Sequence, residues 1–189
     1  FSCPLFPVPH RQTPRRPRDA RVVELRTALA DCDAIDSSGL SPQETFDRYL
    51  LQLGLRNEIW ELTENQSFKS NPMALMWPLE ATAYMDRSYA PVEQRMASMA
   101  SLMRAVPAYL DSLRAMLEPP FAKPVLAQSI EAYAGVAGFY RGDVTDFAEA
   151  NLGLADGLDV MKAAEEAAVA IDTMVAYLRS HESTAHDDF

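Results

Sequence analysis

Apolar residues recur at spacings of three and four along most of this 189-residue chain, which is the pattern of amphipathic helices. No useful length of sequence alternates apolar and polar residues with period two, so we expect no strands. The first periodic stretch predicts a helix over residues 19–35 and a turn over residues 36–39. The apolar face of this helix consists of Val22, Leu25, Leu29 and Cys32.

A second helix is predicted to begin at Ser41. Ser41 is a good N-cap residue, Pro42 suits the first helical position, and Glu44 can complete a capping box. Gly54 has the position of a C-terminal stop. The stripe expected to be buried between these ends consists of Phe46, Tyr49, Leu50 and Leu53. The stretch after it, 55–62, fits a helical turn or a loop equally well, and the polar residues 63–70 predict a connection.

Prolines punctuate the middle of the chain, over residues 71–139. A proline ring is tolerated in the first turn of a helix, so Pro72, Pro91 and Pro124 each predict a helix start. The pair Pro119-Pro120 predicts a helix end, because the residue before a proline is pushed out of the α region.

One helix is therefore predicted over residues 71–87, with a kink at Pro78. The helix that begins at Pro91 contains Pro107, whose ring clashes with the carbonyl of Met103 and should bend or split the helix there. The apolar positions of this helix are Met96, Met99, Leu102, Met103, Val106, Leu110, Leu113 and Leu117.

The next helix is predicted over residues 124–140, ending at Gly142-Asp143, with Leu126, Ile130 and Tyr133 on its apolar face. Gly135 and Gly138 lower its helix propensity, so we expect another helix backbone to approach closely there. The cleanest pattern, over residues 156–180, is a heptad seam that needs a partner helix within this chain or beyond it. The seam consists of Met161, Ala164, Ala168, Ile171, Val175 and Leu178.

These elements predict an all-α fold, an irregular multi-helix bundle with proline-punctuated helices. A hydrophobic content of 48% and only 7 glycines suit such a fold. Residues 1–20, which are basic and rich in proline, predict a disordered or extended lead-in. Residues 21–189 predict a single helical domain or the front portion of a larger helical fold.

The charge of the chain limits its partners. The net charge is −10, and the first 21 residues carry +4, which leaves −14 on the rest. An acidic body argues against nucleic acid as a partner, because phosphate binding needs a basic face. No apolar run is long enough for a membrane span. The two cysteines, Cys3 and Cys32, favour the cytoplasm, while a lipoprotein or exported form is the less favoured alternative.

The search for catalytic residues gives none, but two groups of residues carry candidate binding chemistry. The aromatic residues Trp60, Trp77, Tyr84 and Tyr89 cluster in sequence near Arg56 and Arg87. They favour core packing, and the alternative is a substrate-facing cleft formed by Arg56, Trp60, Tyr84, Arg87 and Tyr89.

The second group, His181, Glu182 and His186, is near a zinc motif. The two histidines are five residues apart, which places them about 140° apart on an ideal helix, whereas a zinc pair needs a spacing of four. No third ligand is evident, and the remaining histidine, His10, lies in the lead-in. A frayed polar helix end is the favoured interpretation, and we predict no metal at these residues.

A series of short motifs in fixed order resembles a known family. They are Asn71-Pro72, then the step Arg87-Ser88-Tyr89-Ala90-Pro91, then Arg95, then Val106-Pro107-Ala108-Tyr109-Leu110, and finally Leu117-Glu118-Pro119-Pro120. Over residues 46–189 the chain is similar to the N-terminal region of the bacterial domain of unknown function family 885 (DUF885).

This resemblance implies a function for a larger protein. Members are longer and are similar to helical zinc peptidases, with the presumed metal site in a downstream helix that this sequence does not contain. The chain is then the N-terminal portion of a peptidase-like zinc hydrolase, which shapes one wall of a cleft and lacks the catalytic site. No cofactor is expected in this chain, and zinc belongs to a full-length parent.

The expected partner is the missing C-terminal half or a second chain. The seam and the glycine face should then leave an apolar patch that promotes self-association. The alternatives are a stand-alone helical-bundle binding or scaffold protein, and an enzyme that uses the terminal histidines or a site not recognised from sequence.

Overall fold

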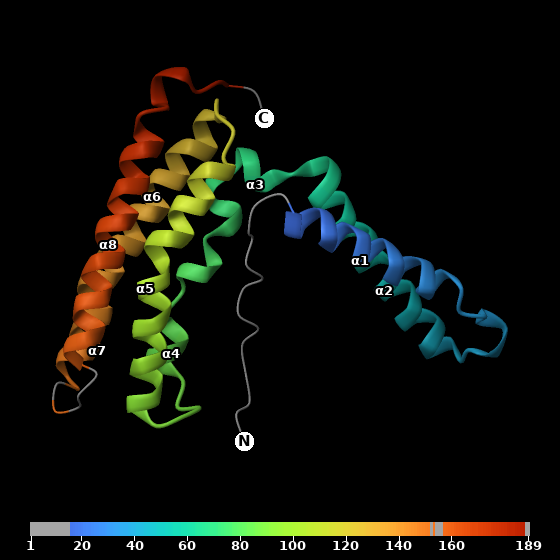
Figure 1. Cartoon of the computed structure of the whole chain (residues 1–189), viewed down its shortest axis with the longest axis horizontal. Helices are drawn as coiled ribbons and strands as arrows, with labels where there is room; N and C mark the ends of the chain where they lie inside the picture. The colour runs from blue at the N-terminus through green and yellow to red at the C-terminus, as the bar shows by residue number, and fades with distance from the viewer. Residues whose placement is uncertain (1–15, 152, 154–156, 188–189) are drawn as a thin grey trace. The chain divides into compact units, whose positions relative to one another are not determined.

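The computed structural model of the protein describes residues 16–151, 153 and 157–187. The chain divides into two compact units, residues 1–67 and 68–189, and Figure 1 shows the helices of each. Among the described residues there is no strand, and a single isolated bridge joins Ala122 to His186. The prediction of an all-α fold is confirmed. None of the helices in this described part is long and apolar enough to cross a membrane.

In the first unit the helical elements are α1 (Arg16–Asp33), η1 (Ser37–Gly39), α2 (Pro42–Trp60) and the π-helical turn η2 (Glu61–Asn65), with α3 (Ser67–Ser70) at the boundary between the units. In the second unit they are η3 (Pro72–Leu75), η4 (Trp77–Leu79), α4 (Thr82–Asp86), α5 (Val92–Met116), α6 (Lys123–Phe139), the π-helical turn η5 (Tyr140–Val144), α7 (Thr145–Glu149), α8 (Gly157–Arg179) and η6 (Glu182–Thr184).

The first unit is an antiparallel hairpin of α1 and α2 (Figure 1). The predicted face of α1 is confirmed, since Leu25 and Cys32 are buried. The capping box of α2 is also present: the Ser41 N–H donates to the Glu44 carboxylate at 2.8 Å, and the Glu44 N–H donates to the Ser41 hydroxyl at 3.3 Å. Helix α1 begins at Arg16, so residues 16–20 of the predicted lead-in are helical, and residues 1–15 lie outside the described residues.

Helix α2 does not end at Gly54, as the sequence predicted. It continues to Trp60 and then widens into the π-helical turn η2, so the stretch 55–62 is helical. Its half-buried residues Leu55 and Ile59 extend the side that packs on α1. The helix is terminated by Gln66, which adopts a left-handed conformation with φ 47° and donates its N–H to the Glu61 carbonyl at 2.9 Å.

The stripe predicted to be buried on α2 is exposed. Phe46, Tyr49, Leu50 and Leu53 are between 48% and 57% exposed. The opposite side of α2 faces α1, and beside the half-buried Leu55 and Ile59 it makes polar contacts. Arg48 donates to the Cys32 carbonyl at 2.9 Å, and Gln52 donates to the Asp33 carboxylate at 2.6 Å. The periodicity identified the apolar face of α2 correctly, but α2 contacts α1 through its opposite face.

In the second unit, α8 packs along both α5 and α6 (Figure 1). The seam of α8 is buried within the chain, with Ala164, Ala168 and Ile171 fully inaccessible and Met161 half-buried. The predicted apolar face of α5 is buried as well, with Leu102 at its edge. The seam therefore finds its partner helices inside this chain, and the apolar patch predicted there is absent from the described structure.

Helix α5 continues through Pro107 as one helix, so of the two predicted outcomes the split is wrong, and the bend stays a prediction. The residues on either side explain its continuity. Met103 and Val106 before the proline, and Leu110 after it, are all buried in one core. Packing of both halves into the same core outweighs the backbone hydrogen bond that the proline ring removes.

Two glycine-based predictions fail in α6. Gly142 does not end the helical path, which continues through η5 into α7. Gly135 and Gly138 are exposed, and a Cβ atom placed on either would meet no atom within 4 Å. No other helix therefore approaches these glycines closely in the described structure.

The segment 71–87 is not one helix with a kink. It forms the two 3₁₀ turns η3 and η4 and then the short helix α4. Pro72 and Pro78 each lack an N–H, so a regular helix here would lose donors in two consecutive turns. Asn71 caps the first turn instead, with its side-chain oxygen accepting the Met73 N–H at 2.9 Å.

Three tyrosine hydroxyls satisfy the carbonyl groups of this broken segment. Tyr133 donates to the Pro72 carbonyl at 2.8 Å, and Tyr140 donates to the Leu79 carbonyl at 2.7 Å. The third hydroxyl belongs to Tyr109 on α5, and it donates to the Leu75 carbonyl in η3. Each bond joins residues more than thirty positions apart in sequence. The tyrosines thus hold the turns against α5, α6 and η5.

We expect Tyr140→Phe to lower the free energy of unfolding of the second unit by about 1–2 kcal/mol, because the buried Leu79 carbonyl loses its donor. Urea denaturation followed by the fluorescence of Trp77 in a Trp60→Phe background measures this loss. Tyr89→Phe, which removes an exposed hydroxyl in the same unit, is the matched control and should change stability by less than about 0.5 kcal/mol. Equal stability of the two variants would contradict the role given to Tyr140.

The same tyrosines predict alkaline destabilisation. Burial raises the pKa of Tyr109 to about 12 and raises the pKa of Tyr133 and of Tyr140. In the unfolded chain these hydroxyls ionise from about pH 10. Their contribution is therefore complete below pH ~10 and is lost as the pH rises toward the folded-state pKa. Denaturation at several pH values should show stability falling between about pH 10 and 12, less steeply in Tyr109→Phe; a flat profile would be evidence against this.

The exposed stripe of α2 should make the chain bind a hydrophobic dye such as ANS and self-associate at high concentration. The double variant Leu50→Gln/Leu53→Gln should reduce both effects. A double replacement of exposed apolar residues on α8, Leu158→Gln/Val169→Gln, is the matched control and should leave them largely unchanged. Dye titration and sedimentation velocity provide the two measurements, and equal behaviour of the two double variants would refute this assignment.

Candidate functional site

The predicted substrate-facing residues are divided between the two units. Arg56 and Trp60 lie on α2, where Arg56 is exposed at 3.7 Å from Asp33. Tyr84 lies on α4, with Arg87 and Tyr89 after it in the second unit.

Core packing, the interpretation favoured from sequence, does not account for most of the aromatic side chains of this cluster. Trp60, Trp77 and Tyr89 are between 43% and 59% exposed, and Tyr84 is half-buried. Burial raises the pKa of the Tyr84 hydroxyl, and Tyr89 adds to that effect. Exposed aromatic surface of this kind is available for contact with a ligand or a partner.

A buried arginine positions helix α4, which carries Tyr84, and the loop after it, which carries Tyr89. Arg95, on α5, donates to the carbonyls of Tyr84 at 2.6 Å and Met85 at 3.0 Å, which belong to the last turn of α4. It also donates to the Ala90 carbonyl at 3.2 Å. A cation at the C-terminal carbonyls of a helix is favourable, so Arg95 has a structural role here. The sequence marked Arg95 only as part of a family motif.

The terminal histidines do not form a frayed end. His181 packs edge-on against the rings of Tyr177 and Phe121, with centroids at 4.8 and 5.6 Å. His186 donates its N–H to the Phe121 carbonyl at 3.0 Å, and its carbonyl accepts the Lys123 N–H at 2.8 Å. Within the described ranges no three His, Cys, Asp or Glu residues are placed to hold a metal. His10 lies outside those ranges.

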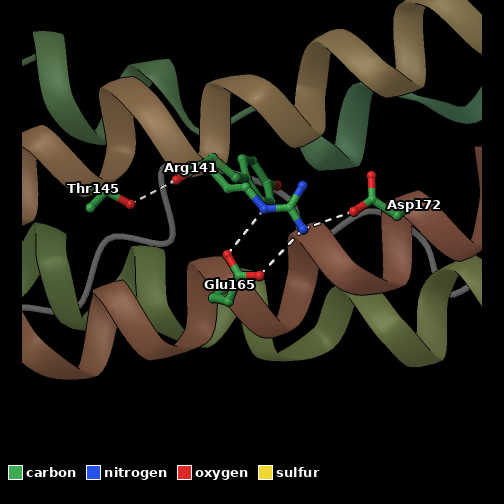
Figure 2. A network of polar contacts seen from close by, with 5 residues as sticks. Arg141, Thr145, Glu165 and Asp172 are labelled. Carbon is green, nitrogen blue, oxygen red and sulfur yellow. Dashed lines mark hydrogen bonds and ion pairs between the residues drawn. The ribbon is translucent and has the colours of Figure 1, made fainter.

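A network of three charged side chains is centred on Arg141 on η5 (Figure 2). Its guanidinium donates to Glu165 at 3.1 and 3.3 Å and to Asp172 at 2.8 Å, both on α8. These two carboxylates raise the pKa of Arg141, with Asp172 the larger cause. Thr145 donates to the Tyr140 carbonyl at 3.1 Å in the same turn. Because every charge in this network is paired, we assign it to holding η5 on α8.

A groove of about 430 Å³ lies between the 3₁₀ turn η4 and helix α6. Trp77, Glu80 and Thr82 line it from the side of the turn. The α6 side consists of Ala132, Gly135, Val136 and Phe139. These four share one helix face, and the glycine at the centre leaves that face open, since a Cβ there would have no neighbour within 4 Å.

The groove combines apolar walls with one carboxylate. Trp77 is 59% exposed, and Glu80 follows it by three residues, with a bond from the Glu80 N–H to the Trp77 carbonyl at 3.1 Å. The Glu80 carboxylate accepts the Thr82 N–H at 2.7 Å, which fixes its orientation. Glu80 is the charged residue among the described residues that line the groove.

Sequence reasoning found only part of this groove. Trp77 was included in the aromatic cluster, and Gly135 was given a packing role that the structure does not support. Glu80 was missed, because its importance depends on lining residues of α6 that come more than fifty positions later. The sequence signal that could have identified Glu80 was a single carboxylate close to Trp77, in a segment that prolines interrupt. Chemically, the groove has the features of a binding site.

Comparison with solved structures shows that the fold occurs within a larger protein. A chain described as "a putative lipoprotein of unknown function from Shewanella oneidensis" is similar, with a TM-score of 0.77 and 19% sequence identity. The alignment covers 88% of this chain and 31% of that chain, so this chain spans about a third of the length of the solved one. At this level of identity the likeness shows the fold.

Comparison of the sequence with families tests the resemblance inferred from the ordered motifs. No curated protein matches the chain. The profile of one family, described as bacterial protein of unknown function (DUF885), matches residues 12–189, which is nearly the whole chain. The resemblance to this family is therefore confirmed, and the chain belongs to the bacterial family DUF885.

Proposed function

We propose that this chain is the helical N-terminal portion of a longer peptidase-like hydrolase, in which it shapes one wall of a substrate cleft. The observation that carries the proposal is the unequal coverage of the structural alignment, 88% of this chain against 31% of the solved chain. A fold that occurs as one part of a longer chain supports a role as a component. The peptidase-like activity itself rests on the family resemblance.

Zinc, the metal implied by that resemblance, does not fit the described histidines, His181 and His186. The half-buried His181 packs against two aromatic rings, and the backbone of His186 is hydrogen-bonded to Phe121 and Lys123. A tetrahedral site needs at least three protein ligands, and the described residues bring no third one to these histidines. We therefore assign the zinc and the catalytic groups to a part of the longer protein outside this chain.

Two surfaces of the chain support a role as a cleft wall. The groove beside Trp77 is concave, apolar and provided with a carboxylate, which are the features of a ligand pocket. The exposed stripe of α2, with Phe46 and Leu50, is apolar surface that a further part of the protein would cover. The first surface would face substrate, and the second would face the rest of the fold.

The alternative function is a helical-bundle binding or scaffold protein complete in itself. Its support is the seam of α8, which α5 and α6 bury within this chain. The cellular location of the protein is likewise part of the proposal. The cysteine content predicts the cytoplasm, whereas the description of the structural neighbour as a lipoprotein gives no preference for the cytoplasm over export.

Sequencing the gene past the codon for Phe189 tests the proposal. We expect the reading frame to continue into a helix rich in histidine and glutamate. The longer product, supplied with zinc, should cleave members of a fluorogenic peptide library, and a chelator should abolish the cleavage. The 189-residue chain alone should not cleave them.

A reading frame that stops at Phe189, with a monomeric product that melts in one transition, would overturn this proposal and favour the scaffold. A longer product without zinc-dependent cleavage would overturn the peptidase assignment and leave the role as an N-terminal portion.

A further inference from the structure

We propose that the groove between Trp77 and α6 binds a cationic group carried on an apolar stem, as in an arginine or lysine side chain. That the cation belongs to a peptide rests on the proposed function. The binding site itself rests on the geometry and charge of the groove.

The groove is large enough to admit an extended side chain. Its volume of about 430 Å³ is within the range of ligand pockets, roughly 300–1,000 Å³. The space exists because Gly135 has no side chain where Ala132, Val136 and Phe139 surround it on the same face of α6. An aliphatic stem placed there would contact the apolar walls of the groove. It would occupy the space that a leucine at position 135 would fill.

The aromatic wall favours a cation at the end of that stem. Trp77 is 59% exposed and lines the groove, so its indole ring is accessible to a ligand. Tryptophan has the strongest cation–π attraction of the aromatic residues, and a guanidinium also stacks on its face.

Glu80 determines the sign of the charge that the groove accepts. Its carboxylate is held by the Thr82 N–H and shares the groove with Trp77, and no basic residue is among the described residues of the lining. An anionic ligand would be repelled, and a neutral one would displace water from the carboxylate without replacing its hydrogen bonds. A cation can form an ion pair with Glu80 and a cation–π contact with Trp77.

The surrounding charge acts in the same direction. The sequence of the second unit, residues 68–189, contains nine basic and seventeen acidic residues, a net charge of −8. Several of the basic residues are engaged in ion pairs, such as Arg141 with Asp172 and Lys123 with Asp187. An acidic body of this kind raises the local concentration of cationic ligands, and the effect weakens with added salt.

The test measures ligand binding by the fluorescence of Trp77 in the full chain carrying Trp60→Phe, which leaves one tryptophan. The first probe is acetyl-alanyl-arginyl-alanine amide. The second is the same peptide with citrulline, which keeps the shape of arginine but is neutral. The third, butylguanidinium, carries the cation and its stem without a peptide backbone.

Two pairs of variants separate the groove from the rest of the surface. Glu80→Gln removes the charge but retains an oxygen that can accept the Thr82 N–H, and Glu131→Gln removes an exposed carboxylate of α6 outside the groove lining. Gly135→Leu fills the groove, and Gly138→Leu adds the same side chain to an exposed position outside it. Neither leucine meets a neighbouring atom at its Cβ, and both raise helix propensity, so both variants should fold.

We expect the arginine peptide to bind about three- to tenfold more tightly than the citrulline peptide. Glu80→Gln should remove that difference, and Gly135→Leu should weaken binding by more than about tenfold, while the two control variants bind as the parent does. Equal binding of both peptides would overturn the proposal, as would undetectable binding of all three probes or retention of binding in Gly135→Leu.

The third probe distinguishes this proposal from the proposed function. If butylguanidinium binds as tightly as the arginine peptide, the cation site stands and its ligand is a free organic cation, not a peptide. If the peptide binds more tightly, its backbone adds contacts and the peptide assignment is supported. Absence of peptide cleavage by a longer product would leave either binding result unchanged.

Discussion

The second unit depends on the hydrogen bonds that three tyrosines make to a segment unable to form its own. Prolines at 72 and 78 prevent a regular helix over residues 71–79, so the carbonyls of two short turns need donors from elsewhere. Tyr109, Tyr133 and Tyr140 provide them. Because a buried carbonyl without a donor costs about 1–3 kcal/mol, these bonds decide where the segment can lie. The groove beside Trp77 inherits its position from them, since Leu79, the acceptor of Tyr140, directly precedes Glu80.

Different interactions pair the helices in the two units. In the second, apolar residues of α5 and α8 are removed from water, which is the dominant stabilising term in most folds. In the first, α1 and α2 are joined by bonds such as Arg48 to the Cys32 carbonyl and the ion pair of Arg21 with Glu58, while the apolar stripe of α2 faces solvent. Exposed ion pairs of this kind contribute about 0–1 kcal/mol each. The hairpin therefore leaves the larger apolar face of α2 exposed to solvent.

What could be predicted from sequence is what depends on local rules. The capping box at Ser41 and the buried faces of α5 and α8 follow from residue type and spacing alone, and the structure has all three. Gly54 and Gly142 were interpreted as helix stops, yet both lie within a continuing helical path. The intrinsic preference of a glycine, about 1 kcal/mol, is smaller than the packing that keeps a helix going. Periodicity also shows that a face is apolar without showing what covers it, which is why the stripe containing Leu50 was expected to be buried.

The groove could not be predicted, because it combines residues from turns and a helix far apart in sequence, but its glycine can be explained from the structure. Glycine within a helix costs about 1 kcal/mol relative to alanine, and close packing against a neighbour is the usual compensation. At Gly135 no described atom would come within 4 Å of a Cβ, so packing gives no reason for the residue. The same space lies beside an accessible indole ring and a fixed carboxylate, on a wall that the tyrosine bonds hold in place. Glycine at position 135 is explained if a ligand occupies the space that a side chain would fill.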